Sequence, residues 1–214
     1  MKLVNTLLSQ VIRLGTLSGK NGGNFYGLNI VRQCVERYGF LESPKVIADY
    51  NLTNGVTFLH GNFNDRFVID KFSVFGNGFF VESKISTNDC EEFLDDVMKW
   101  GQELDSFKYV PDANAPKVFL SNIEVSSTVS FTNSLPKISA FGKEIAKTLR
   151  TYGHITPDWS LAGLAFGNAS SGDAASFKFE QRDISPITND LFFSSARMRT
   201  PDHLRILDLL ETLL

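Results

Sequence analysis

Apolar residues recur at three- and four-residue spacing along much of the chain, which is the period of an amphipathic helix. The first such run covers residues 3–12, and a second begins at the capping residue Asn24 and reaches about Tyr38. A short helical turn is predicted for 44–49, because proline at its start suits the first position of a helix. Three longer helices are predicted for 86–104, 136–152 and 200–214.

From Gly55 onward the period changes to two, which is typical of half-buried antiparallel strands. Gly76-Asn77-Gly78 predicts a tight hairpin turn, because these residues tolerate positive φ. The predicted strands are 56–63, 67–75, 79–84, 118–125, 159–166 and 175–182.

The predicted order of elements is α-α-βββ-α-β-α-ββ-α. Strands in hairpins with helices inserted between them indicate an α+β fold, with an antiparallel sheet of about six strands covered by helices mainly on one face. No internal repeat or low-complexity tract is found in the chain. We therefore expect a single α+β domain over residues 1–214, with 105–117 as a weak possible boundary.

The last predicted helix has more apolar surface than packing on one sheet requires. The excess must be buried in a groove of this domain, in a second copy or in another protein. The N-terminal helix has a similarly broad apolar face and is a further candidate contact element. The predicted partner-binding residues lie in two stripes of the last helix: Leu207, Leu210 and Leu214 in one, and Ile206, Leu209 and Leu213 in the other.

Composition and charge narrow the classes of function. The net charge of −3, without basic runs interleaved with aromatic residues, argues against nucleic-acid binding. No run approaches the ~18 consecutive apolar residues of a membrane span, and residues 1–13 lack a signal-peptide pattern. Cys34 and Cys90 lie on apolar faces of predicted helices, as buried thiols do in a reducing compartment. We expect a soluble, cytoplasmic protein that binds no membrane, and no cofactor is indicated.

Candidate catalytic residues are few. The chain has three histidines, His60, His154 and His203, and none has a second His or Cys at metal-ligand spacing, so no metal site is predicted. The Gly-x-Ser-x-Gly pattern of hydrolases is also missing. The three histidines are the candidates for a scattered histidine–carboxylate site, in which the residues would meet only in the folded chain.

Two other clusters have less specific patterns. Lys20, Gly22 and Gly23 precede a predicted helix, whose free N–H groups attract anions, but their spacing matches no known phosphate loop. We interpret them as a connector with weak anion-binding potential. The acidic residues between 89 and 96 are interpreted as a solvated helix face.

Two hypotheses follow from these patterns. The first is a non-catalytic interaction or subunit protein of an intracellular homo-oligomer or larger assembly, which binds itself or another protein through the C-terminal helix. The alternative is an enzyme, a hydrolase or transferase, with a scattered histidine–carboxylate site.

Overall fold

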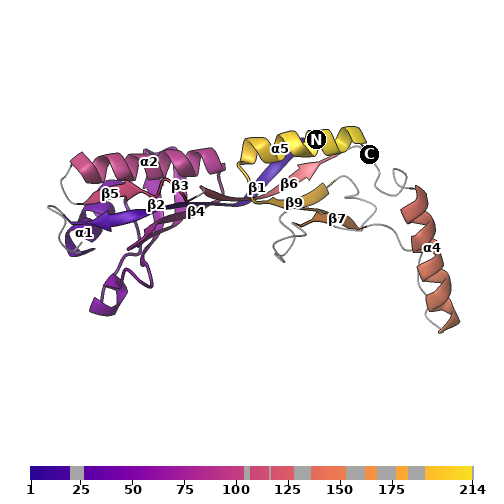
Figure 1. Cartoon of the computed structure of the whole chain (residues 1–214), viewed down its shortest axis with the longest axis horizontal. Helices are drawn as coiled ribbons and strands as arrows, with labels where there is room; N and C mark the ends of the chain where they lie inside the picture. Colours follow the sequence, from indigo (N-terminus) through magenta and orange to yellow (C-terminus); the bar gives the residue numbers. More distant parts are fainter. Residues whose placement is uncertain are drawn as a thin grey trace. The chain divides into compact units, whose positions relative to one another are not determined.

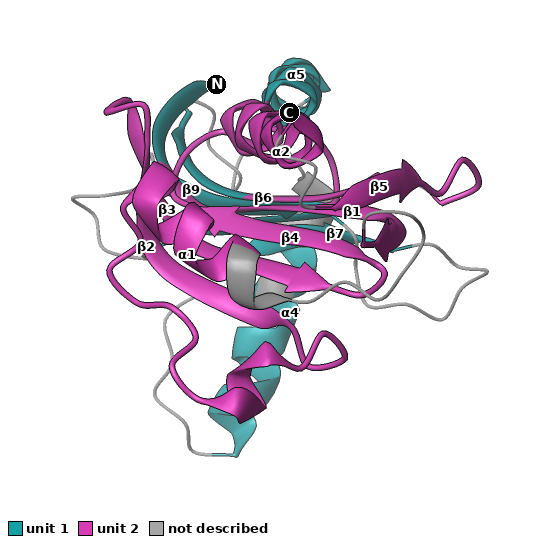
Figure 2. Ribbon diagram, turned by 90° about the vertical axis from the view of Figure 1, so that its left-hand side faces the viewer, with its two compact units in different colours: residues 1–5, 122–196, 201–214 teal, residues 6–121, 197–200 magenta. Residues whose placement is uncertain are grey.

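The structure is a computed structural model that describes residues 1–19, 27–103, 107–115, 117–127, 136–152, 162–167, 177–182 and 191–213. The chain divides into two compact units (Figure 2). Unit 1 comprises residues 1–5, 122–196 and 201–214, and unit 2 comprises residues 6–121 and 197–200. The described residues form an α+β fold with four α-helices and nine antiparallel strands (Figure 1).

Unit 2 contains most of β1 and the three-stranded hairpin array that follows it. Its elements are β1 (Lys2–Ser18, which begins in unit 1), α1 (Gly27–Tyr38), the 3₁₀ turn η2 (Ile47–Tyr50), β2 (Val56–Phe63), β3 (Phe67–Phe75), β4 (Gly78–Ser83), α2 (Thr87–Glu103) and β5 (Lys108–Pro111). The strand order is β2-β3-β4-β1, and β5 pairs with the end of β1. Glycine is needed at the start of β4, because a Cβ at Gly78 would lie 2.2 Å from the carbonyl oxygen of Arg13.

The core of unit 2 is rich in aromatic side chains. Tyr38 of α1 contacts Phe93 of α2 with 5.1 Å between ring centroids, and Phe93 contacts Phe72 of β3 at 5.3 Å. The sheet, α1 and α2 therefore share one core. The fully buried phenylalanines of this unit are Phe58, Phe63, Phe72, Phe79 and Phe93.

Unit 1 is built from the second part of the chain. Its elements are the end of β6 (Val118–Ser126, which begins in unit 2), α4 (Pro136–Thr151), β7 (Gly163–Phe166), β8 (Phe177–Gln181), β9 (Leu191–Ala196) and α5 (Thr200–Leu213, whose first residue lies in unit 2). The strand order is β7-β8-β9-β6. Phe179 and Phe192 stack with 4.7 Å between ring centroids and, with Leu207 of α5, are fully buried in this unit.

The α+β class and several elements are confirmed, whereas the predicted order and strand number are wrong. The observed order is β-α-βββ-α-ββ-α-βββ-α. The predicted N-terminal helix is the strand β1, and β5 and β9 were not predicted. The sheet therefore has nine strands where about six were expected.

The element order repeats within the chain. The succession β1, α1, β2–β4, α2 recurs as β6, α4, β7–β9, α5, and the strand order β2-β3-β4-β1 recurs as β7-β8-β9-β6. Only β5 and the short turn η2 lack a counterpart among the described elements. The expectation of no internal repeat is therefore wrong for the fold. The predicted elements do not show the repeat, because they have a helix in place of β1 and no strand at β9.

Matching residues support this repeat. The residues Leu8-Ser9-Gln10-Val11 of β1 correspond to Leu120-Ser121-Asn122-Ile123 of β6, and Ser9, Val11, Ser121 and Ile123 are all fully buried. A Tyr-Gly pair occurs at the C-terminal end of both first helices: Tyr38 is the last residue of α1 and is followed by Gly39, and Tyr152-Gly153 follows the last residue of α4 in the sequence. From β4 to α2 the residues Phe79, Phe80, Thr87, Asp89, Leu94 and Asp95 recur 113 positions later as Phe192, Phe193, Thr200, Asp202, Leu207 and Asp208.

Candidate functional site: the outward face of α5

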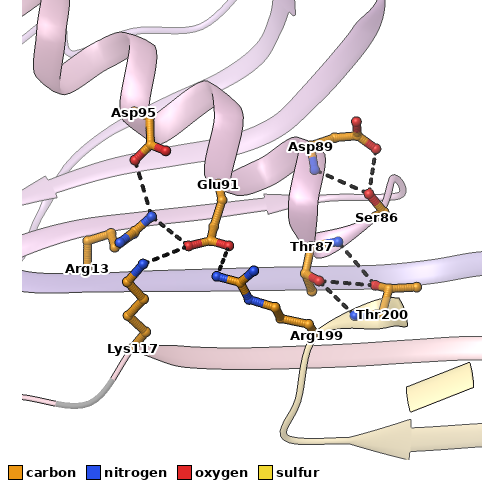
Figure 3. Close-up of polar contacts among 9 residues, drawn as sticks. All are labelled: Arg13, Ser86, Thr87, Asp89, Glu91, Asp95, Lys117, Arg199 and Thr200. Carbon is orange, nitrogen blue, oxygen red and sulfur yellow. Dashed lines mark hydrogen bonds and ion pairs between the residues drawn. The ribbon is translucent and has the colours of Figure 1, made fainter. Parts of the chain in front are cut away.

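Helix α5 begins with a threonine whose role is mirrored at the start of α2. The Thr200 amide donates to Thr87 Oγ1 at 2.8 Å, and the Thr87 amide donates to Thr200 Oγ1 at 3.1 Å (Figure 3). Each hydroxyl therefore satisfies a backbone N–H that a helix start leaves without an intrahelical partner. Pro201 follows at the first full helical position, where its missing N–H costs nothing. This arrangement positions the N-terminus of α5.

One face of α5 packs into unit 1. His203 and Leu207 are fully buried, one helical turn apart, and the ring of His203 lies 5.8 Å from the ring of Phe177 on β8. Leu207 was predicted to contact a partner. Its burial inside unit 1 makes it a core residue and leaves it unavailable to another chain.

The other apolar stripe of α5 is open. Leu209 is 52% exposed, Leu213 is 73% exposed, and Ile206 beside them is half-buried. Leu210, between the two faces, is also half-buried, and Leu214 lies outside the described residues. We call Ile206, Leu209 and Leu213 the outward stripe. It is an apolar surface on a capped, well-anchored helix.

Acidic side chains lie on a different side of α5. The Met1 amine donates to Asp208 at 2.7 Å and also to Glu211, whose second oxygen accepts from Ser127 at 2.6 Å. Hydrogen bonds to Asp208 and Glu211 raise the pKa of the Met1 amine, and the hydrogen bond from that amine lowers the pKa of Glu211. These contacts join Met1, which precedes β1, and Ser127, which follows β6, to α5 within unit 1.

His203 and Ser194 form the one serine–histidine contact among the described residues. Ser194 Oγ lies 2.8 Å from His203 Nε2 and donates its proton to the Lys178 carbonyl at 2.7 Å. His203 Nε2 must therefore be the donor toward Ser194, and Nδ1 has no partner among the described residues. Burial lowers the pKa of His203 to about 4. Since both side chains are fully buried and the hydroxyl proton is engaged, this pair serves packing and offers no activated nucleophile.

Of the other sequence-predicted catalytic and anion-binding residues, His60 alone lies in the described part of the chain. His60 is exposed on β2, with a positive φ of 55°. His154 and the predicted anion-binding residues Lys20, Gly22 and Gly23 lie outside the described residues. Of the candidate catalytic residues, His60 therefore lies in unit 2 and His203 in unit 1.

A buried carboxylate in unit 2 binds three cations, which the sequence did not reveal. Glu91 on α2 accepts from Arg13 and Arg199, each at 2.6 Å, and lies 3.3 Å from Lys117 (Figure 3). Asp95 adds a second acceptor for Arg13 at 3.2 Å. The interpretation of a solvated acidic face is wrong for Glu91, because this residue is 7% exposed.

The geometry of this ion cluster indicates a structural role. Both carboxylate oxygens of Glu91 are engaged by cations, so neither is available to accept a proton from a substrate. Arg199 also lies over the ring of Phe119, 5.1 Å from its centroid. The cluster therefore holds residues 197–200 against α2 and the first residues of β6 within unit 2.

Unit 2 also contains a hollow of about 380 Å³ on its sheet. Lys71 is the one charged residue in its lining, and its ammonium lies 5.6 Å from the centroid of Phe80. The hydroxyls of Thr57 and Ser73 in the lining are 2.9 Å apart and hydrogen-bonded to each other. The lining contains no histidine or carboxylate, so it lacks the groups of a general acid–base pair.

Comparisons with protein-family models, with curated proteins and with solved structures find no match. Among the described residues, no group of His, Cys, Asp and Glu side chains has the arrangement of a metal site. No helix in the described part of the chain is both long and apolar enough to cross a membrane.

Proposed function

We propose that this chain is a non-catalytic interaction protein that assembles through the outward stripe of α5, as a subunit of an intracellular homo-oligomer or larger assembly. The observation that carries this proposal is the exposure of Leu209 and Leu213, at 52% and 73%, on a helix whose opposite face is buried. Large apolar side chains grouped on one exposed face are typical of contact surfaces.

The construction of α5 supports a binding role. The reciprocal threonine contacts fix its start, and the burial of His203 and Leu207 fixes its rotation about its axis. A rigid helix that presents apolar residues at i, i+3 and i+7 is a common form of protein recognition, because little entropy is lost when it binds. The proposed intracellular setting is supported by Cys34 and Cys90, which are buried and unpaired.

Light scattering coupled to size exclusion tests the proposal. We expect the wild-type protein to be larger than a monomer, or to co-purify with a defined partner, and Leu213→Asp to give a monomer. A charge in the centre of an apolar contact must be desolvated, which weakens binding by about 100-fold or more.

Thr212→Asp is the matched control. It places the same charge in the same last turn of α5, beside the outward stripe rather than in it, and should leave the assembly intact. A wild-type protein that is monomeric at all concentrations and has no partner in its host would refute the proposal.

A further inference from the structure

Unit 2 shows how the second helix of the repeated order is covered. Tyr38 at the end of α1 donates a 2.8 Å hydrogen bond to Asp96 of α2, and its ring contacts Phe93 and Trp100. Arg37 adds a bidentate pair with Asp96, with its closest contacts at 3.0 Å. Phe93, Asp96 and Trp100 thus form the face of α2 that receives a helix.

The corresponding face of α5 is the outward stripe. Positions 113 residues after Phe93, Asp96 and Trp100 are Ile206, Leu209 and Leu213, in the alignment fixed by Thr87 and Thr200. The same alignment pairs the sheet-facing Leu94 with the buried Leu207. The outward stripe is therefore the counterpart of a helix-receiving surface, with leucine in place of the aspartate and tryptophan.

Helix α4 is the counterpart of α1, and both ends of its apolar face are exposed. When Tyr152 is aligned with Tyr38, Ile145 and Leu149 correspond to Val31 and Val35. Tyr38 is buried, whereas Tyr152 is 72% exposed. Phe141, one turn before Ile145, is 66% exposed. Ile145 and Leu149 are half-buried and Ala146 is fully buried, so Phe141 and Tyr152 are the exposed part of this face. Among the described residues, α4 and the outward stripe of α5 thus each present exposed apolar side chains.

The charges of the two helices are complementary. Helix α4 is basic, with four cationic residues and one anionic residue, and α5 is acidic, with three anionic residues and one cationic residue. The same signs occur in unit 2, where Arg37 of α1 pairs with Asp96 of α2. Asp208 and Glu211 lie on another side of α5 and pair with Met1, so the opposite net charges favour the approach of the two helices and supply no contact within the outward stripe. The charged residues are Lys137, Lys143, Glu144, Lys147 and Arg150 on α4, and Asp202, Arg205, Asp208 and Glu211 on α5.

We propose that the outward stripe of α5 receives α4 of a second copy of this chain, in the place that α1 fills on α2. The proposal rests on the function proposed above and names the partner. A second copy is chosen because the same chain presents exposed apolar side chains on both helices. If two copies exchange α4 symmetrically, two identical α4–α5 contacts form, and the dimer is closed. The outward stripe alone is smaller than a stable interface requires, and α4 supplies the additional apolar area.

Cysteine cross-linking tests the pairing of α4 with α5. Thr151 and Leu209 are the counterparts of the contacting pair Arg37 and Asp96. Thr151→Cys and Leu209→Cys are prepared as separate proteins, mixed, unfolded and refolded together, and treated with bismaleimidoethane. We expect a covalent dimer from the mixture at several times the yield from either variant alone.

The natural cysteines do not interfere with this measurement. Cys34 and Cys90 are fully buried, and burial raises the pKa of each thiol to about 12, so neither reacts at neutral pH. Asp208→Cys in place of Leu209→Cys is the control, because Asp208 is exposed on a different side of α5. Its yield of covalent dimer should be at least several-fold lower. Circular dichroism confirms that each variant folds.

A second variant separates this inference from the function on which it rests. Tyr152→Ser should raise the dissociation constant of the dimer at least tenfold, because it removes an aromatic anchor. An oligomer that gives no α4–α5 cross-link, or that ignores Tyr152→Ser, overturns the inference and leaves the proposed function standing. A monomeric wild-type protein overturns both the inference and the proposed function. If a chain that carries both cysteines forms the cross-link only within itself, both are overturned as well, because its own α4 then covers the outward stripe.

Discussion

The second helix of each unit begins in the same way and differs in what covers it. Thr87 and Thr200 exchange backbone hydrogen bonds at the two helix starts, and Leu94 and Leu207 are buried at corresponding positions. Beyond these shared features, α2 is covered by α1, whereas the outward stripe of α5 is exposed. A repeated fold can thus keep its caps and sheet-facing core while the second helix of one repeat has an exposed apolar face.

The two units also differ in the chemistry of one core position. Cys90 of α2 and His203 of α5 are counterparts, as are Val81 of β4 and Ser194 of β9, and all four side chains are fully buried. Unit 2 therefore has an apolar pair where unit 1 has a hydrogen-bonded polar pair. A buried polar pair stabilises a core only while each group has the protonation state that its hydrogen-bond partner requires.

The largest expected difference between the units is the loss of stability when the helix-receiving residue is truncated, Phe93 in unit 2 and Ile206 in unit 1. Phe93→Ala should destabilise unit 2 by about 3–5 kcal/mol, because it removes a fully buried ring that contacts Tyr38 and Phe72. In the monomeric Leu213→Asp background, the counterpart Ile206→Ala should cost only about 1 kcal/mol, because Ile206 is half-buried in the single chain. Urea unfolding followed by circular dichroism measures both values. Equal losses would show that the two faces are covered to the same extent.

The next effect is a pH dependence that only unit 1 should show. The pKa of His203 is about 4 in the folded protein, below the ~6.5 of an exposed histidine, so the unfolded chain binds more protons between these values. Stability should fall by roughly 3 kcal/mol as the pH decreases from ~6.5 to ~4, and this contribution is fully present above pH ~6.5.

Replacing the polar pair isolates that effect. The double variant Ser194→Val with His203→Cys recreates the residues of unit 2, and its unfolding free energy should lack this part of the pH dependence. The measurement compares urea midpoints of the variant and the wild type at pH 4.5 and 7.5. The same acid-induced loss in both proteins would rule out His203 as the cause.

The smallest expected difference concerns the two tyrosines that end the first helices. Tyr38→Phe should cost about 1–2 kcal/mol, because it removes the hydrogen bond to the Asp96 carboxylate. Tyr152→Phe in the monomeric Leu213→Asp background should change stability by less than about 0.5 kcal/mol, because Tyr152 is exposed. Thermal unfolding measures both. A loss at Tyr152 as large as that at Tyr38 would place its hydroxyl in a contact within the monomer.

Much of the fold follows from local patterns. The helix predicted for 86–104 is α2, Thr87–Glu103, and Phe93, Leu94 and Val97, which recur at helical spacing in the sequence, are fully buried. The three-stranded array β2–β4 was also predicted closely, because alternating apolar residues and the Gly76-Asn77-Gly78 turn act over short distances.

The errors occur where distant strands decide the structure. The residues of 3–12 fit the helical period, yet β1 is a strand because it pairs with β4, from Ser9 opposite Ser83 to Leu14 opposite Gly78. Strand β9 is short, and its pairing with β8 defines it. The β1–β4 pairing joins residues far apart in the chain, and no local period reveals it.

The same distinction between local patterns and distant contacts applies to the candidate site. The sequence by itself determined that the last helix begins at Thr200-Pro201 and has two apolar stripes, because capping and helical period are local properties. Only the tertiary structure decided that His203 and Leu207 face the core and that Leu209 and Leu213 remain exposed. A helical period shows that apolar faces exist, whereas the surface that covers each face is supplied by residues distant in the sequence.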